Sequence, residues 1–483
     1  MDSLKLRGTF LVQYDALLMP EFTDLLKTLD PARYELGVWH EIVEQMVRAV
    51  GIEWRGRFTW DWHCHCGFSV GYTGPQRETL ADELFSKFRE VFGYLPRVFG
   101  SWLFDTHTAE YICGKYDPDA MCICKEQYGT DGYTLWGGYY GQAYYPSKSN
   151  IFIPAQSRAM QLDTPVFRML GSDPVRQYDF GLDMETGADR VQKVITLEPV
   201  CQGSGGGSPE WVDWFLRENF NGECLSFGYA QAGQENSFGW SAMKAGLEYQ
   251  FRRFAEMRDT GAITVEPLGE TGRKFRAAYS STPASAIVAH TAFDDPLVSS
   301  VWYSSSNYRI NLYCDHGRLR IRDLHVFSWR VRDSYADEAC SGDAAAYETL
   351  PVIDGNRFSG RGVLAGAFLT GPGGADFPVG EMRFSDTGRG RARVTYGDGF
   401  TAELAPDRVS FIANREFMLE NRIGDRESDH LPEVVYSEQR CVRLMYNRVE
   451  YGVRLYNGRF VPSDAGYDTV SERGEIKAEI LTF

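Results

Sequence analysis

Two acidic residues directly follow apolar runs that have the composition of buried strands: Asp105 ends GSWLFD, and Glu198 ends ITLE. Glycoside hydrolysis uses such a pair, because one carboxyl group protonates the leaving oxygen while the other attacks the sugar or activates water. We therefore take Glu198 and Asp105 as the leading catalytic pair, with Asp131, Glu41 and Glu235 as further candidates. The alternatives are that Asp105 caps a helix and that Glu198 belongs to a salt bridge.

The stretch TWDWHCHCGF, residues 59–68, has acidic and imidazole groups at alternate positions. If it forms a strand, Asp61, His63 and His65 share one face. Neighbouring residues on a face lie about 6.6 Å apart, so two of them could share a zinc ion that Asp15 or His40 would complete. The candidate metal ligands are therefore Asp15, His40, His63 and His65, and no other cofactor is indicated. Histidines that are hydrogen-bonded without a metal fit the pattern equally well.

Aromatic residues are crowded into the Gly-rich stretch 122–150, where Gly and Pro prevent a long helix or strand. At the mouth of a barrel such rings could stack against the apolar faces of sugars. The expected substrate-binding residues combine these rings with nearby polar groups: Trp136, Tyr139, Tyr140, Tyr144, Tyr145, His40, Arg168 and Gln234. The alternatives are that the rings pack the loop against a neighbouring domain and that Arg168 forms a structural ion pair.

The elements that must position these residues follow from hydrophobic periodicity. Apolar runs alternate with amphipathic segments over residues 1–285, which predicts βα units and a parallel sheet. Seven or eight such units close most naturally into a (β/α)7–8 barrel, whose chemistry lies at the carboxyl ends of the strands. The expected strands are Gly8–Tyr14, Tyr34–Trp39, Arg57–His65, Val98–Phe104, Ala120–Lys125, Val166–Leu170, Lys193–Leu197 and Leu225–Tyr229. The expected helices are Trp39–Val50, Gln76–Phe92, Thr106–Tyr116, Pro209–Phe220 and Ser241–Thr260.

Residues 286–483 show a different pattern, in which short strand-like segments are separated by turns rich in Gly and Asp. Regular short strands with turn signals are typical of an antiparallel β-sandwich. The predicted domains are therefore a catalytic barrel, residues 1–285, and a sandwich, residues 286–483.

The composition limits the classes of partner. Fifty Lys and Arg against 66 Asp and Glu give a net charge of −16, which argues against nucleic acids and anionic membrane surfaces. We find no signal-peptide pattern and no run of about 18 apolar residues. Ten Cys residues are then taken as reduced thiols of a cytoplasmic protein. The expected partner is a small carbohydrate, and a homo-oligomer is left open.

Two segments resemble polysaccharide-deacetylase-like barrels: YELGVWHE, residues 34–41, and FREVFGYLPRVFGSWLFDTHTAEYI, residues 88–112. The segments GTDGYTLWGGYY, YYPSK and FRMLGSDPVRQYD are similar to a bacterial family of unknown function that is common in gut bacteria. That second resemblance covers most of the chain.

The first resemblance implies a distorted (β/α)7 barrel, which deacetylases share with certain glycoside hydrolases. In the deacetylases one Asp and two His hold a metal. Asp15 and His40 match the Asp and the first His, but Glu44 occupies the position of the second His. In the related hydrolases two carboxylates perform the reaction, which fits Glu198 with Asp105 or Asp131 better.

We therefore expect a carbohydrate-active enzyme, a glycoside hydrolase that acts on a small oligosaccharide or glycoside. The alternatives are a metal-dependent carbohydrate deacetylase and a non-catalytic sugar-binding protein on a degenerate barrel.

Overall fold

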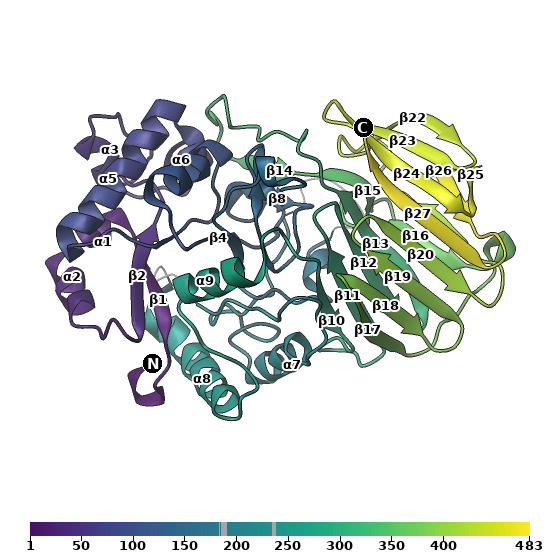
Figure 1. Cartoon of the computed structure of the whole chain (residues 1–483), viewed down its shortest axis with the longest axis horizontal. Coiled ribbons are helices and arrows are strands. Elements are labelled where there is room, and N and C mark those ends of the chain that lie inside the picture. The colour runs from purple at the N-terminus through teal and green to yellow at the C-terminus, as the bar shows by residue number, and fades with distance from the viewer. Residues whose placement is uncertain (183, 185–190, 234–237) are drawn as a thin grey trace.

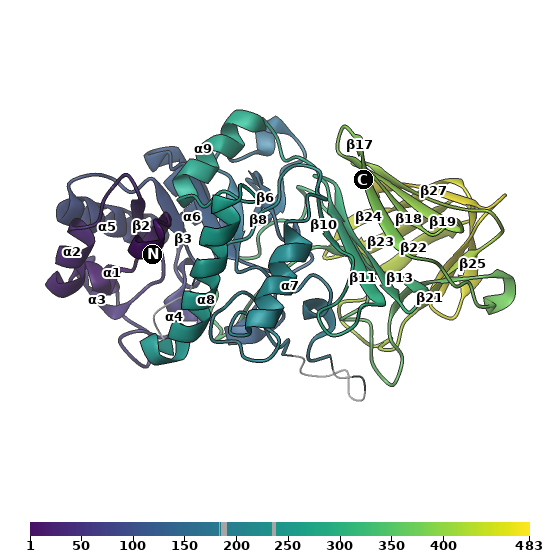
Figure 2. The ribbon, with the colours of Figure 1, turned by 90° about the horizontal axis from the view of Figure 1, so that it is seen from below.

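The computed structural model describes residues 1–483 except 183, 185–190 and 234–237. The chain forms an α/β part and a β-rich carboxyl-terminal part, which lie side by side along the long axis of the molecule (Figure 1). The view from below shows the same division, with β10 and β11 nearest the α/β part (Figure 2).

A parallel sheet forms the centre of the α/β part. Its parallel strands lie in the order β1 (Gly8–Val12), β2 (Tyr34–Trp39), β3 (Val98–Gly100), β4 (Ala120–Cys124) and β9 (Val166–Met169). The short strand β6 (Ala143–Tyr144) pairs antiparallel with β9 and ends the sheet. The strands are almost wholly apolar, as expected for a parallel sheet that is covered on both faces. This sheet is open within the described residues, so the βα alternation is confirmed but barrel closure is not.

Helices cover both faces of the parallel sheet. One buried cluster joins Val38, Phe99 and Met121 of the strands to side chains of α5 and α6, and a second joins Cys122 and Phe167 to α9. The helices are α1 (Tyr14–Leu17), α2 (Pro20–Lys27), α3 (Glu44–Ala49), α4 (Cys64–Gly67), α5 (Gly74–Phe92), α6 (Thr106–Tyr116), α7 (Pro209–Asn219), α8 (Trp240–Asp259) and α9 (Leu268–Ala278).

The long helices have sequence signals at their ends. Thr73 and Gln76 form a capping box at the start of α5, and Gly93 ends that helix in the left-handed conformation with φ 85°. Asp105 caps α6 and Ser208 caps α7. The predictions of helices at α5, α6, α7 and α8 are confirmed.

The predicted strand Arg57–His65 is wrong, because these residues form bends that lead into α4. The carboxylate of Asp61 accepts hydrogen bonds from the backbone N–H groups of Arg57 and His63, at 2.8 and 3.2 Å. Such local bonds from an Asp side chain compete with a strand ladder. The predicted strands Lys193–Leu197 and Leu225–Tyr229 are also wrong, since the first contributes only a bridge between Ser172 and Thr196.

The carboxyl-terminal part contains two large antiparallel sheets. One has the order β10-β11-β12-β13-β16-β21-β26-β25 with β15 beside β13, and the other has the order β17-β18-β19-β20-β27-β24-β23-β22. Apolar side chains of both sheets form a common buried cluster, so the β-rich architecture is confirmed. The strands of the first sheet are β10 (Ser285–Ala289), β11 (Val298–Ser304), β12 (Tyr308–Asp315), β13 (Arg318–Val326), β15 (Leu350–Asp354), β16 (Gly366–Thr370), β21 (Met418–Arg422), β25 (Arg459–Ser463) and β26 (Gly466–Val470). The second has β17 (Met382–Gly388), β18 (Arg391–Tyr396), β19 (Phe400–Ala405), β20 (Arg408–Ala413), β22 (Glu433–Glu438), β23 (Cys441–Tyr446), β24 (Val449–Asn457) and β27 (Glu475–Thr482).

Backbone pairing joins the two parts. Strand β14 (Ala345–Glu348), which follows a long connection from β13, pairs in parallel with β5 (Tyr133–Trp136) of the α/β part. The nearby strands β7 (Pro146–Ser147) and β8 (Asn150–Pro154) form a hairpin. The connection also docks on the α/β part directly, because the backbone N–H of Asp333 bonds to Ser149 and that of Cys340 bonds to Val70. The loop that carries the predicted rings is therefore held between the two parts.

Candidate functional site

Three of the predicted acids surround one buried pair, Cys124 and Tyr133, beyond the carboxyl end of β4. Burial, with a contribution from the carboxylates of Asp131 and Glu198, raises the pKa of the Cys124 thiol to about 12. Burial also holds the pKa of Tyr133 well above its usual value, with contributions from Asp131 and Glu41. Glu198 therefore lies within electrostatic range of Cys124, Glu41 within range of Tyr133, and Asp131 within range of both.

Glu41 is oriented by two neutral donors. Its Oε2 accepts hydrogen bonds from Nε2 of Gln13 at 3.1 Å and from Nε1 of Trp60 at 3.0 Å. The side chain is buried, and both Gln13 and Glu41 follow the carboxyl ends of strands, β1 and β2. Two donors on Oε2 hold the carboxyl group in one orientation.

The other two acids lie on turns. Glu198 is half-buried, and its backbone N–H bonds to Oγ1 of Thr196 at 3.2 Å. Asp131 has a positive φ of 56°. Its side chain counts as exposed by surface area, yet it is closely surrounded by protein atoms, whose desolvation raises its pKa.

Half-buried tryptophans accompany Glu41. Trp39 ends β2, and its ring meets Trp102 edge-on with centroids 5.2 Å apart. Trp60, the donor to Glu41, is half-buried as well. These rings keep part of their surface available, as a stacking surface for a sugar requires.

A second group of polar side chains lies in one row across the sheet. Val38, Phe99, Met121 and Val166 occupy one register level of β2, β3, β4 and β9. The hydrogen-bond ladder continues past this register level, because the N–H of His40 donates to the carbonyl of Gly100 and the N–H of Ser101 donates to the carbonyl of Cys122. Side chains alternate faces, so the next level on the same face holds His40, Ser101, Ile123 and Arg168. Lys125 follows two residues after Ile123.

The row contains buried polar atoms without hydrogen-bond partners in the described part of the chain. They include both ring nitrogens of His40, Oγ of Ser101 and Nη2 of Arg168. Burial lowers the pKa of His40 to about 4 although the charge of Asp105 opposes this, so the imidazole is neutral at pH 7. Unpartnered buried polar atoms are rare in proteins and point to bound water or a ligand.

Two cations belong to this row. The guanidinium of Arg168 is 2% exposed, donates from Nε to the carbonyl of Cys124 at 2.8 Å, and lies 4.6 Å from the ring centroid of Phe152. Lys125 is 6% exposed, and its Nζ lies 5.2 Å from the ring centroid of Tyr140. Burial and the charge of Arg168 lower the pKa of Lys125 to about 7.

Asp105 has a structural environment. Its Oδ1 accepts from the backbone N–H of Thr108 and lies 2.9 Å from Arg77, and its Oδ2 accepts from Ser69 and from the Thr108 hydroxyl. The residue is fully buried. No contact within the described residues joins Asp105 to Glu198. The capping alternative accounts for the bonds from Thr108, and Ser69 and Arg77 are its other partners.

The rings of the aromatic loop are buried rather than exposed. Tyr140 stacks on Trp302 of β11 with centroids 3.7 Å apart and planes at 9°. Trp136 donates to Asp354 at 2.7 Å and packs on Tyr178. The remaining rings donate their hydroxyl groups to backbone carbonyls: Tyr139 to Pro283, Tyr144 to Ile151 and Tyr145 to Tyr279. This arrangement matches the alternative in which the rings pack against the neighbouring part.

Two of the four candidate metal ligands lie together and the other two lie apart from them. The rings of His63 and His65 have centroids 6.1 Å apart, and Asp343 lies 3.8 Å from the first and 3.1 Å from the second. His40 lies in the sheet row instead. Asp15 accepts from the backbone N–H of Ala16 in α1. Within the described residues no three His, Cys, Asp or Glu side chains are grouped as a metal site would require. The remaining predicted residues, Gln234 and Glu235, lie outside the described residues.

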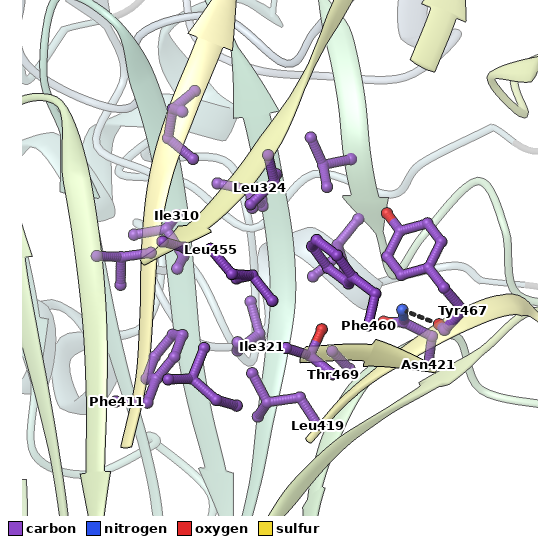
Figure 3. A pocket seen from close by; sticks show the side chains of 18 residues that line it. Ile310, Ile321, Leu324, Phe411, Leu419, Asn421, Leu455, Phe460, Tyr467 and Thr469 are labelled. Atoms are coloured by element: carbon purple, nitrogen blue, oxygen red, sulfur yellow. Dashed lines mark hydrogen bonds between the residues drawn. The ribbon is translucent and has the colours of Figure 1, made fainter. Parts of the chain in front are cut away.

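A pocket inside the sandwich lies away from this chemistry. Side chains of both sandwich sheets line it, among them Ile310, Phe411, Leu455 and Phe460 (Figure 3). No acidic or basic side chain is part of the lining, so the pocket is a gap in an apolar core rather than a catalytic cavity. The described helices include none that is long and apolar enough to cross a membrane.

Comparison with known proteins gives a likeness of fold. No protein-family model and no curated protein matches the chain. A solved structure of a proposed glycoside hydrolase/deacetylase from Parabacteroides distasonis is similar, with a TM-score of 0.55 and 14% identity, over 72% of this chain and 79% of that one. A family 81 glycoside hydrolase from Clostridium thermocellum matches over 35% of this chain and 21% of that one, at 12% identity and a TM-score of 0.15, which carries no argument. The comparison thus shows a distant likeness of fold to the Parabacteroides distasonis protein.

Sequence reasoning missed Lys125, Ser101 and the role of Gln13. Lys125 is the one charged residue of the apolar run AMCICK, and that run ends at a carboxyl edge where function is expected. A charged residue at the end of a buried strand is the signal that could have identified it. Gln13 directly follows the run GTFLV and carries the same kind of signal.

Proposed function

We propose that the protein is a glycoside hydrolase whose paired carboxylates are Glu41 and Glu198, with Asp131 beside them. The observation that carries this proposal is that the carboxylates of Asp131 and Glu198 act on Cys124, at the carboxyl end of β4, while those of Asp131 and Glu41 act on the adjacent Tyr133. The fold likeness to a proposed glycoside hydrolase/deacetylase supports it. In this proposal the open parallel sheet is the retained part of a distorted barrel, residues 1–285 form the catalytic domain, and the sandwich braces it.

The proposed chemistry assigns one proton transfer and one attack. One carboxyl group protonates the glycosidic oxygen as the bond to the anomeric carbon breaks, and the other carboxylate attacks that carbon or removes a proton from attacking water. Gln13 and Trp60 hold the Glu41 carboxylate through its Oε2. Trp39, Trp60 and Trp102 would contact the sugar face, in place of the buried rings of the aromatic loop.

The test is turnover of a panel of aryl glycosides by the wild type, Glu41→Gln and Glu198→Gln. Each amide removes one proton-transfer or nucleophilic group, so kcat should fall about 10²- to 10⁴-fold while sugar binding persists. Glu21→Gln, which alters an exposed carboxylate on α2, should keep wild-type kcat. Wild-type-like turnover by both active-site variants would refute the pair.

Two other outcomes identify the alternative functions. Release of acetate from acetylated sugars that chelators abolish would establish a metal-dependent deacetylase. Sugar binding by the wild type without turnover of any glycoside in the panel would establish a non-catalytic binding protein.

A further inference from the structure

Lys125 and Arg168 form a buried cationic site that lacks a carboxylate partner. Neither side chain makes an ion pair within the described residues, whereas Arg309 and Arg357, which are equally buried, each contact two carboxylates. Charged groups in protein interiors are normally paired, since an unpaired buried charge is strongly unfavourable. Lys125 and Arg168 therefore lack the carboxylate partners that Arg309 and Arg357 have.

The acids nearest to the two cations are engaged elsewhere. Glu126 accepts from the backbone N–H of Gly137 and from Arg309 at 2.7 Å, both through Oε1. Asp173 accepts from the backbone N–H groups of Val175 and Arg176 and from Trp211. Both acids influence the charge of Lys125, but neither bonds to it.

The surrounding atoms offer both donors and acceptors. Nη2 of Arg168 is an unpartnered donor, while Oε2 of Glu126 and Oε1 of Gln142 are unpartnered acceptors within the described residues. Gly141 adjoins Lys125, and a Cβ at that position would lie 2.5 Å from Cδ1 of Ile287 and 3.3 Å from Nζ of Lys125. The Gly141 backbone therefore packs closely beside the ammonium group, with Ile287 on its other side.

This cationic site adjoins the proposed acids. Arg168 bonds to the carbonyl of Cys124, and its charge acts on the Cys124 thiol together with those of Asp131 and Glu198. Glu198 and Arg168 therefore both lie within electrostatic range of Cys124. An acidic sugar offers both a charged acceptor and several donors. Its carboxylate can accept hydrogen bonds from the two cations, and its hydroxyl groups can donate to the unpartnered acceptors.

We propose that Lys125 and Arg168 bind the carboxylate of an acidic sugar, so that the substrates are uronic-acid glycosides. This inference rests on the proposed glycoside hydrolase function, because it takes the bound sugar to be the substrate. The binding itself can be tested without measuring turnover. Glu126 and Gln142 accept hydroxyl groups of the same sugar, and Arg168 and Lys125 each donate to its carboxylate.

The test compares the binding of glucuronate, galacturonate, their neutral counterparts glucose and galactose, and acetate by titration calorimetry. Charge-assisted bonds should make one uronate bind about 10- to 100-fold more tightly than the matched neutral sugar. Lys125→Met should remove most of that preference and leave binding of the neutral sugar unchanged. Lys148→Met, which removes an exposed lysine of the neighbouring hairpin, should retain the preference.

The pH dependence gives a second readout that a purely structural lysine would not produce. The groups that face Lys125 are Arg168, Glu126, Asp173, Cys124 and Tyr140. Because Lys125 loses its charge near pH 7, uronate affinity of the wild type should fall as the pH rises above about 7. The affinity of Lys125→Met should stay flat over that range.

Several results would overturn the proposal. Equal affinity for uronates and neutral sugars, or an unchanged preference in a folded Lys125→Met, excludes a carboxylate site at these residues. Acetate binding as tightly as a uronate would show a free-anion site instead. If Lys125→Met does not fold, the wild-type sugar comparison and its pH profile decide. Absence of glycoside turnover alongside selective uronate binding would refute the proposed hydrolase function and leave this inference standing.

Discussion

Asp105 shows how the surroundings of a single carboxylate decide its role. Two hydroxyl groups, one backbone N–H and the guanidinium of Arg77 contact it, and both charged side chains are buried. Both oxygens of Asp105 are engaged within the protein, which fits a structural role for this carboxylate. Glu41 accepts bonds from Gln13 and Trp60 just beyond the carboxyl end of β2, and we prefer it in the proposed pair because of that position.

Replacement of Asp105 by Ala should therefore lower the stability of the fold, because the role of this residue is structural. The change removes the α6 cap and leaves Arg77 as an uncompensated buried charge, so the free energy of unfolding should fall by about 3–5 kcal/mol. Urea denaturation measures this. Asp24→Ala, on the exposed face of α2, should change the same quantity by less than about 0.5 kcal/mol. A loss below about 1 kcal/mol for Asp105→Ala would contradict the structural role.

Asp333 should make stability depend on pH. Burial, together with the charge of Asp105, raises its pKa to about 7 in the folded protein from an ordinary value near 3.8. Between these values the folded state binds the extra proton, so the free energy of unfolding should fall as the pH rises from about 4 to 7. Thermal unfolding across this range tests the effect. Asp333→Asn should flatten the decline, whereas Glu338→Gln, exposed in the same connection, should preserve it.

At the scale of elements, periodic and capped segments were predictable. The strands β1, β2, β4 and β9 are short apolar runs bounded by polar residues, and α5 and α6 carry their own start signals. The segment 57–65 has a period of two as well, but hydrogen bonds to Asp61 fold it into bends. Alternation describes a strand only when a neighbouring strand is available, and no local pattern reveals that.

The candidate site was predictable only in part, because some of its features depend on contacts between residues that are far apart in the sequence. The search for polar residues at strand ends selected Glu41, which follows β2, and Asp131, which follows β4, because the carboxyl ends of parallel strands meet at one edge. It selected Glu198 through a predicted strand that does not form. Whether a ring faces a ligand or a second domain depends on contacts between residues far apart in sequence, such as Tyr140 with Trp302. Composition alone cannot separate these cases.

The stacked pair should behave as a packing element between the two parts. Tyr140→Ala deletes a buried ring that lies parallel to Trp302, so the free energy of unfolding should fall by about 3–5 kcal/mol. Tyr140→Phe keeps the ring and should cost much less. Denaturation of the two variants gives this comparison. A selective loss of sugar affinity in a fully stable Tyr140→Ala would instead restore the ring to the binding surface.

At the scale of the whole molecule, the two parts should unfold together. Strand β14 pairs with β5, and the buried Arg309 of β12 bonds to Glu126 and to the carbonyl of Gly138. Calorimetry of the full chain should show one cooperative transition. Residues 1–284 alone should lack a cooperative transition, because Glu126 and the rings of the aromatic loop would lose their partners. Two separate transitions in the full chain, or a truncated form that melts within a few degrees of it, would contradict this expectation.

The pairing of β5 with β14 also has a consequence for biosynthesis. A ribosome releases the segment 120–170 long before it has translated Arg309 or the strand that completes β5. The nascent chain must therefore carry an unsatisfied strand edge and exposed rings while the remainder is made, which is the condition under which chains aggregate or recruit chaperones. The yield of native protein should accordingly depend on how quickly the second half of the message is read.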